Sequence, residues 1–102
     1  MSPFTIHLED EFGGVIKEVF DKGLLREYIP EADDKNYCCV KYINRWGNTI
    51  FNELQMDDLI KELVIVTSES EDKEVKTLID QIDNLTQLAK KDVHVYIKFI
   101  GD

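Results

Sequence analysis

The stretch Val93–Ile100, VHVYIKFI, decides the fold because apolar and polar residues alternate along it. A period of two is typical of a half-buried strand, with one face on a core and the other in water. The apolar face is formed by Val93, Val95, Ile97 and Phe99. The opposite face is formed by His94, Tyr96 and Lys98. A strand with one apolar face needs helices to cover it.

The residues before this strand supply those helices. An amphipathic stripe at helical spacing is formed by Val75, Leu78, Ile79, Ile82, Leu85 and Ala89. An earlier helix is predicted from the capping-box pair Asn52 and Gln55. Its apolar side is formed by Met56, Leu59, Ile60 and Leu63. The polar segment Thr67–Ser70 separates the two helices.

The N-terminal half predicts shorter elements. Phe4–Leu8 alternates like a strand, and Val15–Phe20 is interpreted as a short helix that Gly23 ends. Residues 26–36 form a loop, and the β-branched and aromatic run Tyr37–Asn44 predicts a strand. A hairpin turn over residues 44–48 then leads to a strand at Thr49–Phe51, with Gly47 expected to supply a positive φ.

These elements predict a single α+β domain over residues 1–102. Its sheet is expected to be a single four-stranded layer, antiparallel or mixed, with helices on one face and the order β-α-β-β-α-α-β. The N-terminus has no basic and apolar signal-peptide pattern, and the aliphatic run Leu63–Val66 is too short to span a bilayer. We therefore expect a cytoplasmic protein.

The composition is strongly acidic, with 21 Asp and Glu against 12 Lys and Arg and a formal net charge of −9. Such a field repels nucleic acid and anionic lipid and attracts basic protein surfaces. The sequence has no glycine-rich phosphate loop, no metal-spaced Cys/His set and no nucleophile elbow. We therefore expect a binding protein rather than an enzyme, with no cofactor, nucleic-acid partner or membrane partner.

The cysteines and histidines do not predict a site. Cys38 and Cys39 are adjacent, which is neither a redox nor a zinc spacing, and a strand would turn them to opposite faces as one buried and one outward free thiol. His7 and His94 lie on the polar sides of their strands and would be neighbours if those strands pair. Two histidines without a third ligand make a poor metal site, so no metal or catalytic role is expected.

The acids of the first predicted helix are the candidate partner-binding residues. Glu53 and Asp57, and likewise Asp58 and Glu62, are four residues apart on one helix face. Acids in a first turn suit the helix dipole, but a row of like charges also suits a basic partner. Trp46, at the tip of the predicted hairpin, either folds back over the sheet edge or anchors a partner.

Three motifs resemble a family of small acidic bacterial proteins. They are the TIFN turn within Trp46–Asn52, the LQM helix start at Leu54–Met56, and the ending His94–Asp102 with its KFIGD pattern. In size and acidity this family is similar to immunity proteins of bacterial toxin systems, including those of contact-dependent inhibition. The resemblance implies a protein that neutralises a cognate toxin by direct binding and has no active site.

The charge agrees with that expectation. Toxin nucleases are basic because they bind phosphate backbones, and an acidic inhibitor can be steered to them at up to ~10⁸–10⁹ M⁻¹s⁻¹. The expected partner is thus a basic toxin domain. The alternative is a small regulatory domain that binds a peptide or small molecule on the face of His94, Tyr96 and Lys98.

Overall fold

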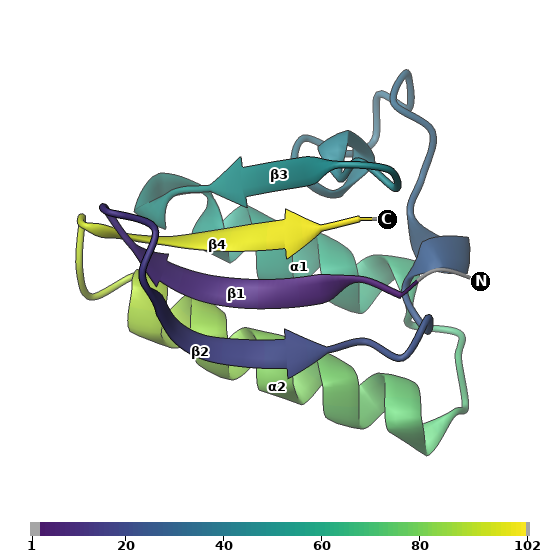
Figure 1. Ribbon diagram of the computed structural model, residues 1–102. Helices are drawn as coiled ribbons and strands as arrows, with labels where there is room; N and C mark the ends of the chain where they lie inside the picture. Colours follow the sequence, from purple (N-terminus) through teal and green to yellow (C-terminus); the bar gives the residue numbers. More distant parts are fainter. Residues whose placement is uncertain (1–2, 102) are drawn as a thin grey trace.

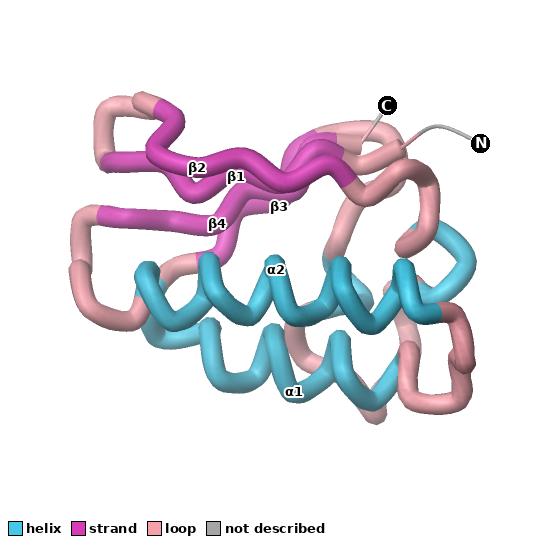
Figure 2. Tube along the Cα trace, turned by 90° about the horizontal axis from the view of Figure 1, so that it is seen from below, coloured by secondary structure: helices cyan, strands magenta, loops and turns pink. Residues whose placement is uncertain are grey.

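In the computed structural model, which describes residues 3–101, four strands form one antiparallel sheet in the order β2-β1-β4-β3. The strands are β1 (Thr5–Asp10), β2 (Val15–Phe20), β3 (Asn48–Phe51) and β4 (Val95–Ile100). Helices α1 (Met56–Val66) and α2 (Lys73–Ala89) pack side by side on one face of this sheet, and the other face is open (Figures 1 and 2). The predicted α+β class is confirmed, and the order of strands and helices is consistent with the predicted one apart from two N-terminal elements.

Strand β4 is central because it pairs with both β1 and β3. Val95, Ile97 and Phe99 are buried as predicted. Val93 precedes the strand and is 59% exposed, so its predicted place in the core is wrong.

Residues 15–20 form strand β2, and the predicted helix there is wrong. The Asp10 carboxylate accepts the backbone N–H groups of Phe12 and Gly14, and Gly13 takes a φ of 83°. This turn directs the chain back along β1, with which β2 pairs antiparallel from Phe20 to Val15, with one shift of register between Leu8 and Glu9. A six-residue helix would have made few internal bonds, and the β-branched residues at 15, 16 and 19 suit a strand.

Residues 37–44 do not form the predicted strand. They contain a single 3₁₀ turn, η2 (Val40–Tyr42). The Glu62 carboxylate accepts the backbone N–H groups of Cys38, Cys39 and Val40, so these groups cannot pair with a neighbouring strand. Val40 and Ile43 nevertheless bury their side chains in the core. Gly47 does not take the positive φ expected of it, because the turn is held by the Asn44 side chain, which accepts the Trp46 N–H at 2.8 Å.

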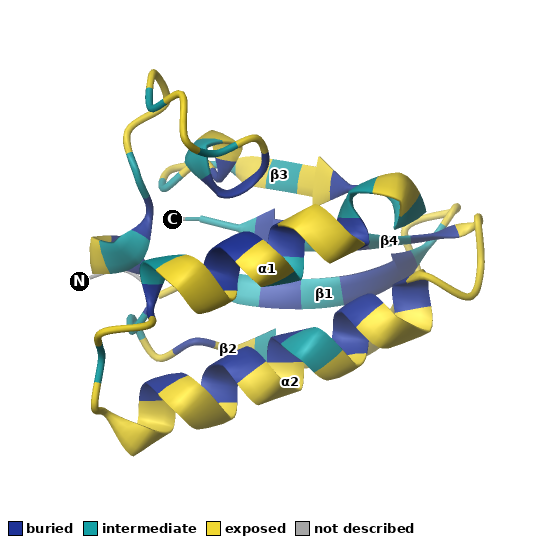
Figure 3. Ribbon diagram, turned by 180° about the vertical axis from the view of Figure 1, so that it is seen from behind, coloured by how far each residue is buried: buried dark blue, intermediate teal, exposed yellow. Residues whose placement is uncertain are grey.

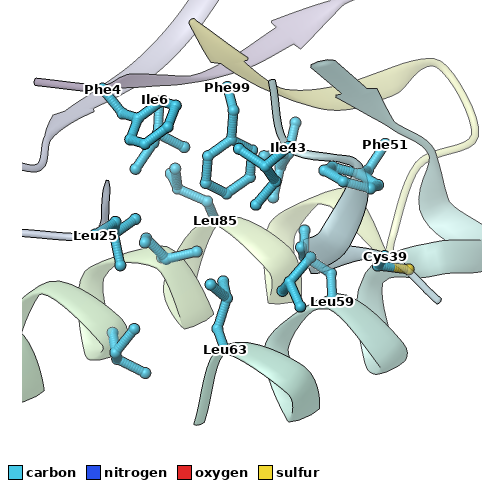
Figure 4. Packing of buried hydrophobic residues seen from close by; sticks show 14 of the residues in the cluster. Phe4, Ile6, Leu25, Cys39, Ile43, Phe51, Leu59, Leu63, Leu85 and Phe99 are labelled. Carbon is cyan, nitrogen blue, oxygen red and sulfur yellow. The ribbon is translucent and has the colours of Figure 1, made fainter. Parts of the chain in front are cut away.

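The core lies between the sheet and the two helices. Figure 3 shows the buried sides of α1 and α2 turned toward the strands. Phe99 is at its centre, with edge-to-face contacts to Phe4 and Phe51 at centroid distances of 6.4 and 5.9 Å (Figure 4). The predicted Asn52–Gln55 capping box is present at η3 (Glu53–Gln55), which leads directly into α1, while Asp72 caps α2.

Candidate interaction surface

The five predicted binding residues do not form one surface. Trp46 precedes β3 and lies beside the end of β4, where the Gly101 N–H donates to the Gly47 carbonyl at 2.8 Å. Glu53 follows the other end of β3, close to the start of α1. Trp46 and Glu53 therefore lie beyond opposite ends of β3, and α1 begins at the same end as Glu53 (Figure 1).

Glu62 is turned into the protein. Its side chain is only 8% exposed, and its carboxylate accepts the N–H groups of Cys38 at 2.7 Å, Cys39 at 2.8 Å and Val40 at 3.0 Å. Burial alone would raise the pKa of Glu62, but these hydrogen bonds outweigh it and hold the pKa below its usual 4.5. Glu62 therefore fastens the loop before η2 to α1, and little of it is left for a partner to touch.

Glu53, Asp57 and Asp58 remain at the surface. Asp57 forms an ion pair with Lys90 at 2.7 Å, whereas Glu53 and Asp58 make no ion pair with any residue between 3 and 101. Leu54 lies beside them and is 82% exposed. Leu54 is not among the predicted binding residues. Its one sequence signal is that it lies outside the apolar spacing that begins at Met56, so the core does not require it.

Two other segments reach the same end of the sheet. The pairing of Asp10 with Val95 sets the β1–β2 turn beside the start of β4, so Phe12 and Val93 both lie there, 89% and 59% exposed. The ion pair between His94 Nδ1 and Glu11 Oε2, at 2.9 Å, joins the two segments. Strand β3 also ends at this end of the sheet, and the chain after it contains Leu54. Because β4 lies between β1 and β3, the axes of β1 and β3 are about 10 Å apart.

We call this region the acidic end. It comprises Glu11, Phe12, Glu53, Leu54, Asp57, Asp58 and Val93. Exposed apolar side chains beside carboxylates are the arrangement of a protein-binding surface, in which apolar anchors are surrounded by a charged rim.

Trp46 covers a cation at the opposite end. Its ring is 75% exposed, and the Arg26 guanidinium carbon lies 4.8 Å from its centroid and 5.4 Å from that of Phe4. The ring thus folds back onto Arg26, which is itself buried between two aromatic rings. Its outer surface is still accessible.

The histidines are separate although their strands pair. His7 lies opposite Lys98 on the open face, and its ring nitrogens lie 2.8 Å from Glu9 and 2.7 Å from Glu18. His94 is four residues before Lys98 and pairs with Glu11 instead. Because both nitrogens of His7 bind carboxylates, neither is directed at a ligand.

The two cysteines are free thiols, Cys38 exposed and Cys39 buried, as predicted. They do not point to opposite faces, however. Cys39 has φ −121° and ψ −60°, which is not a strand conformation, and the two Sγ atoms lie 3.9 Å apart. With a Glu62 carboxylate oxygen they form a group whose atoms all lie within 4.8 Å of one another. Residue spacing could not indicate this group, because Glu62 is 23 residues from Cys39.

No protein-family model matches the sequence, and neither a curated protein nor a solved structure matches it. The likeness to immunity proteins therefore depends on the three short motifs and the charge. Between residues 3 and 101, no helix has both the length and the apolar character needed to cross a membrane.

Proposed function

We propose that this chain is an immunity protein that neutralises a basic toxin domain, a nuclease in the first instance, by binding it at the acidic end. The observation that carries the proposal is the 82% exposure of Leu54 beside Glu53, which makes no ion pair within residues 3–101, together with the 89% exposure of Phe12 at the same end of the sheet. Exposed apolar surface that is rimmed by polar residues marks protein–protein interaction sites.

The two kinds of side chain would have different tasks. Glu53 and Asp58 carry charges with no ion-pair partner between residues 3 and 101, so they attract a basic surface before contact. Phe12 and Leu54 offer apolar surface that leaves water on docking and slows dissociation. Binding of this kind blocks a toxin without any chemistry by the inhibitor.

The net charge supports a nuclease as the partner. A chain of charge −9 is repelled by nucleic acid and attracted by the basic surface that a nuclease presents to phosphates. An inhibitor of such a toxin acts where the nucleic acid is, so the proposal places its action in the cytoplasm.

The alternative, a peptide-binding or ligand-binding platform on His94, Tyr96 and Lys98, has less support. The Lys98 ammonium lies 3.8 Å from Glu9, and His94 pairs with Glu11. These polar groups are thus engaged with neighbouring carboxylates.

The test is protection of cells that express the protein that co-purifies with this chain from its native host, which the proposal expects to be a basic toxin domain. Wild-type protein should restore growth. Leu54→Asp with Phe12→Asp should lose protection, because both side chains are exposed and the substitutions remove the anchors without opening the core. Trp46→Ala, at the opposite end, should keep it. Failure of the wild type to protect, or equal loss in both variants, would contradict the proposal.

A further inference from the structure

We propose that Cys38, Cys39 and Glu62 form a binding site for a thiophilic divalent cation of the zinc class. The inference is independent of the toxin-binding proposal, because these residues lie where α1 holds the loop before η2 rather than among the exposed apolar side chains of the acidic end. It departs from the expectation of no metal site.

The sulfur atoms already have the spacing of a metal-bound pair. Their separation is 3.9 Å. Two thiolates at a Zn–S distance of about 2.3 Å around a tetrahedral ion lie about 3.8 Å apart. A dithiol that meets this distance before an ion arrives loses little conformational freedom on binding.

The third ligand is held in place but has capacity left. Glu62 Oε1 accepts two backbone N–H groups, from Cys39 and Val40, whereas Oε2 accepts only one, from Cys38. A carboxylate oxygen has two acceptor sites, so Oε2 keeps one for a cation. The carboxylate oxygen lies within 4.8 Å of both sulfurs, where a tetrahedral site needs about 3.6 Å, so closing around an ion requires only a small movement of the ligands.

The surroundings are electrically suited to a cation. The carboxylates of Glu62 and Asp58 place negative charge near both sulfur atoms. The negative potential that disfavours a thiolate alone attracts a divalent ion, which deprotonates a coordinating thiol outright.

The binding step exchanges protons for metal. One divalent ion displaces one proton from each thiol, forming two metal–sulfur bonds and releasing two protons to solvent, with no change in oxidation state. The Glu62 carboxylate takes the third position, and its hydrogen bond with the Cys38 thiol is lost together with the thiol proton. A water molecule can take the fourth, since Cys38 faces solvent.

The experiment is titration of the reduced full-length protein with Co²⁺, followed by displacement with Zn²⁺. We expect one Co²⁺ per chain with a thiolate-to-cobalt charge-transfer band, loss of the band on adding Zn²⁺, and a rise in Tm with Zn²⁺ that a chelator reverses. Cys38→Ser should abolish the band and the Tm rise while leaving the circular dichroism spectrum unchanged, because Cys38 is exposed.

The control is His94→Ala, which removes the exposed imidazole beside Glu11. It should leave the stoichiometry and the band unchanged. Absence of the band in the wild type, or a wild-type response in Cys38→Ser, would overturn the proposal.

Discussion

Glu62 Oε1 lies 2.8 Å from the backbone nitrogen of Cys39, a hydrogen bond that joins α1 to a segment 23 residues earlier. The same oxygen accepts the Val40 amide, and Oε2 accepts that of Cys38. One carboxylate therefore satisfies three consecutive N–H groups at the start of η2, which a sheet would otherwise have paired.

Glu62→Ala should destabilise the protein by about 3–5 kcal/mol, because it leaves buried amide donors without an acceptor. Asp58→Ala, four residues earlier and exposed, is the matched control and should cost less than about 1 kcal/mol. Urea unfolding at neutral pH measures both. A Glu62→Ala cost as small as that of Asp58→Ala would show that the three hydrogen bonds do not hold the loop.

The stabilisation from Glu62 should also depend on pH. Because the pKa of Glu62 is lower in the folded protein than its usual 4.5, its contribution is complete above that pH and is lost as the pH falls through the folded value. The measurement is the difference in unfolding free energy between wild type and Glu62→Gln from about pH 7 to about pH 3. It should be constant at the upper end and shrink below 4.5. A difference that does not change with pH would contradict the depressed pKa.

Ile97→Ala should cost about 2–5 kcal/mol through the cavity it leaves, because Ile97 is completely buried under α2 and between β1 and β3. Val93→Ala should cost less than about 0.5 kcal/mol, since Val93 is exposed. Thermal or urea unfolding distinguishes them. Equal costs would mean that Val93 is buried like Ile97, as the alternating pattern predicts, and that β4 does not start at Val95.

Gly101→Ala should destabilise the protein by about 1–3 kcal/mol. A Cβ at Gly101 would lie 2.4 Å from the Asn44 carbonyl oxygen and 2.5 Å from that of Arg45, and backbone atoms cannot move aside cheaply. At Gly47 the nearest atom is the Asn44 side-chain amide at 3.0 Å, so Gly47→Ala should be tolerated. Equal effects of the two substitutions would contradict the close approach of Gly101 to the backbone of Asn44 and Arg45.

The parts of the fold that could be predicted are those in which local pattern and tertiary packing agree. The stripe of α2, the capping box at Asn52 and the buried side of β4 each follow from spacing alone. The need for glycine at position 101, in the KFIGD motif, comes from the backbone of Asn44 and Arg45, which leaves no room for a Cβ. The sequence could not show this contact.

The errors arose where a distant residue changed a local preference. The run from Tyr37 has strand propensity, but Glu62 removes its amides from any ladder. For Val15–Phe20 the decisive partner is strand β1, along which the Asp10 turn directs the chain. The same limit applies to the candidate site, because spacing placed Glu62 on the surface and offered no reason to join Phe12 to Leu54.

The central claim is tested most directly by the rate at which this chain associates with the purified toxin domain that co-purifies with it from its native host, measured against ionic strength. Glu53→Lys with Asp58→Lys should slow association at low salt by about tenfold or more and flatten its salt dependence. Glu69→Lys with Glu71→Lys makes the same charge change in the exposed segment after α1 and should slow it much less. Equal slowing by both pairs, or no slowing by the first, would contradict binding at the acidic end.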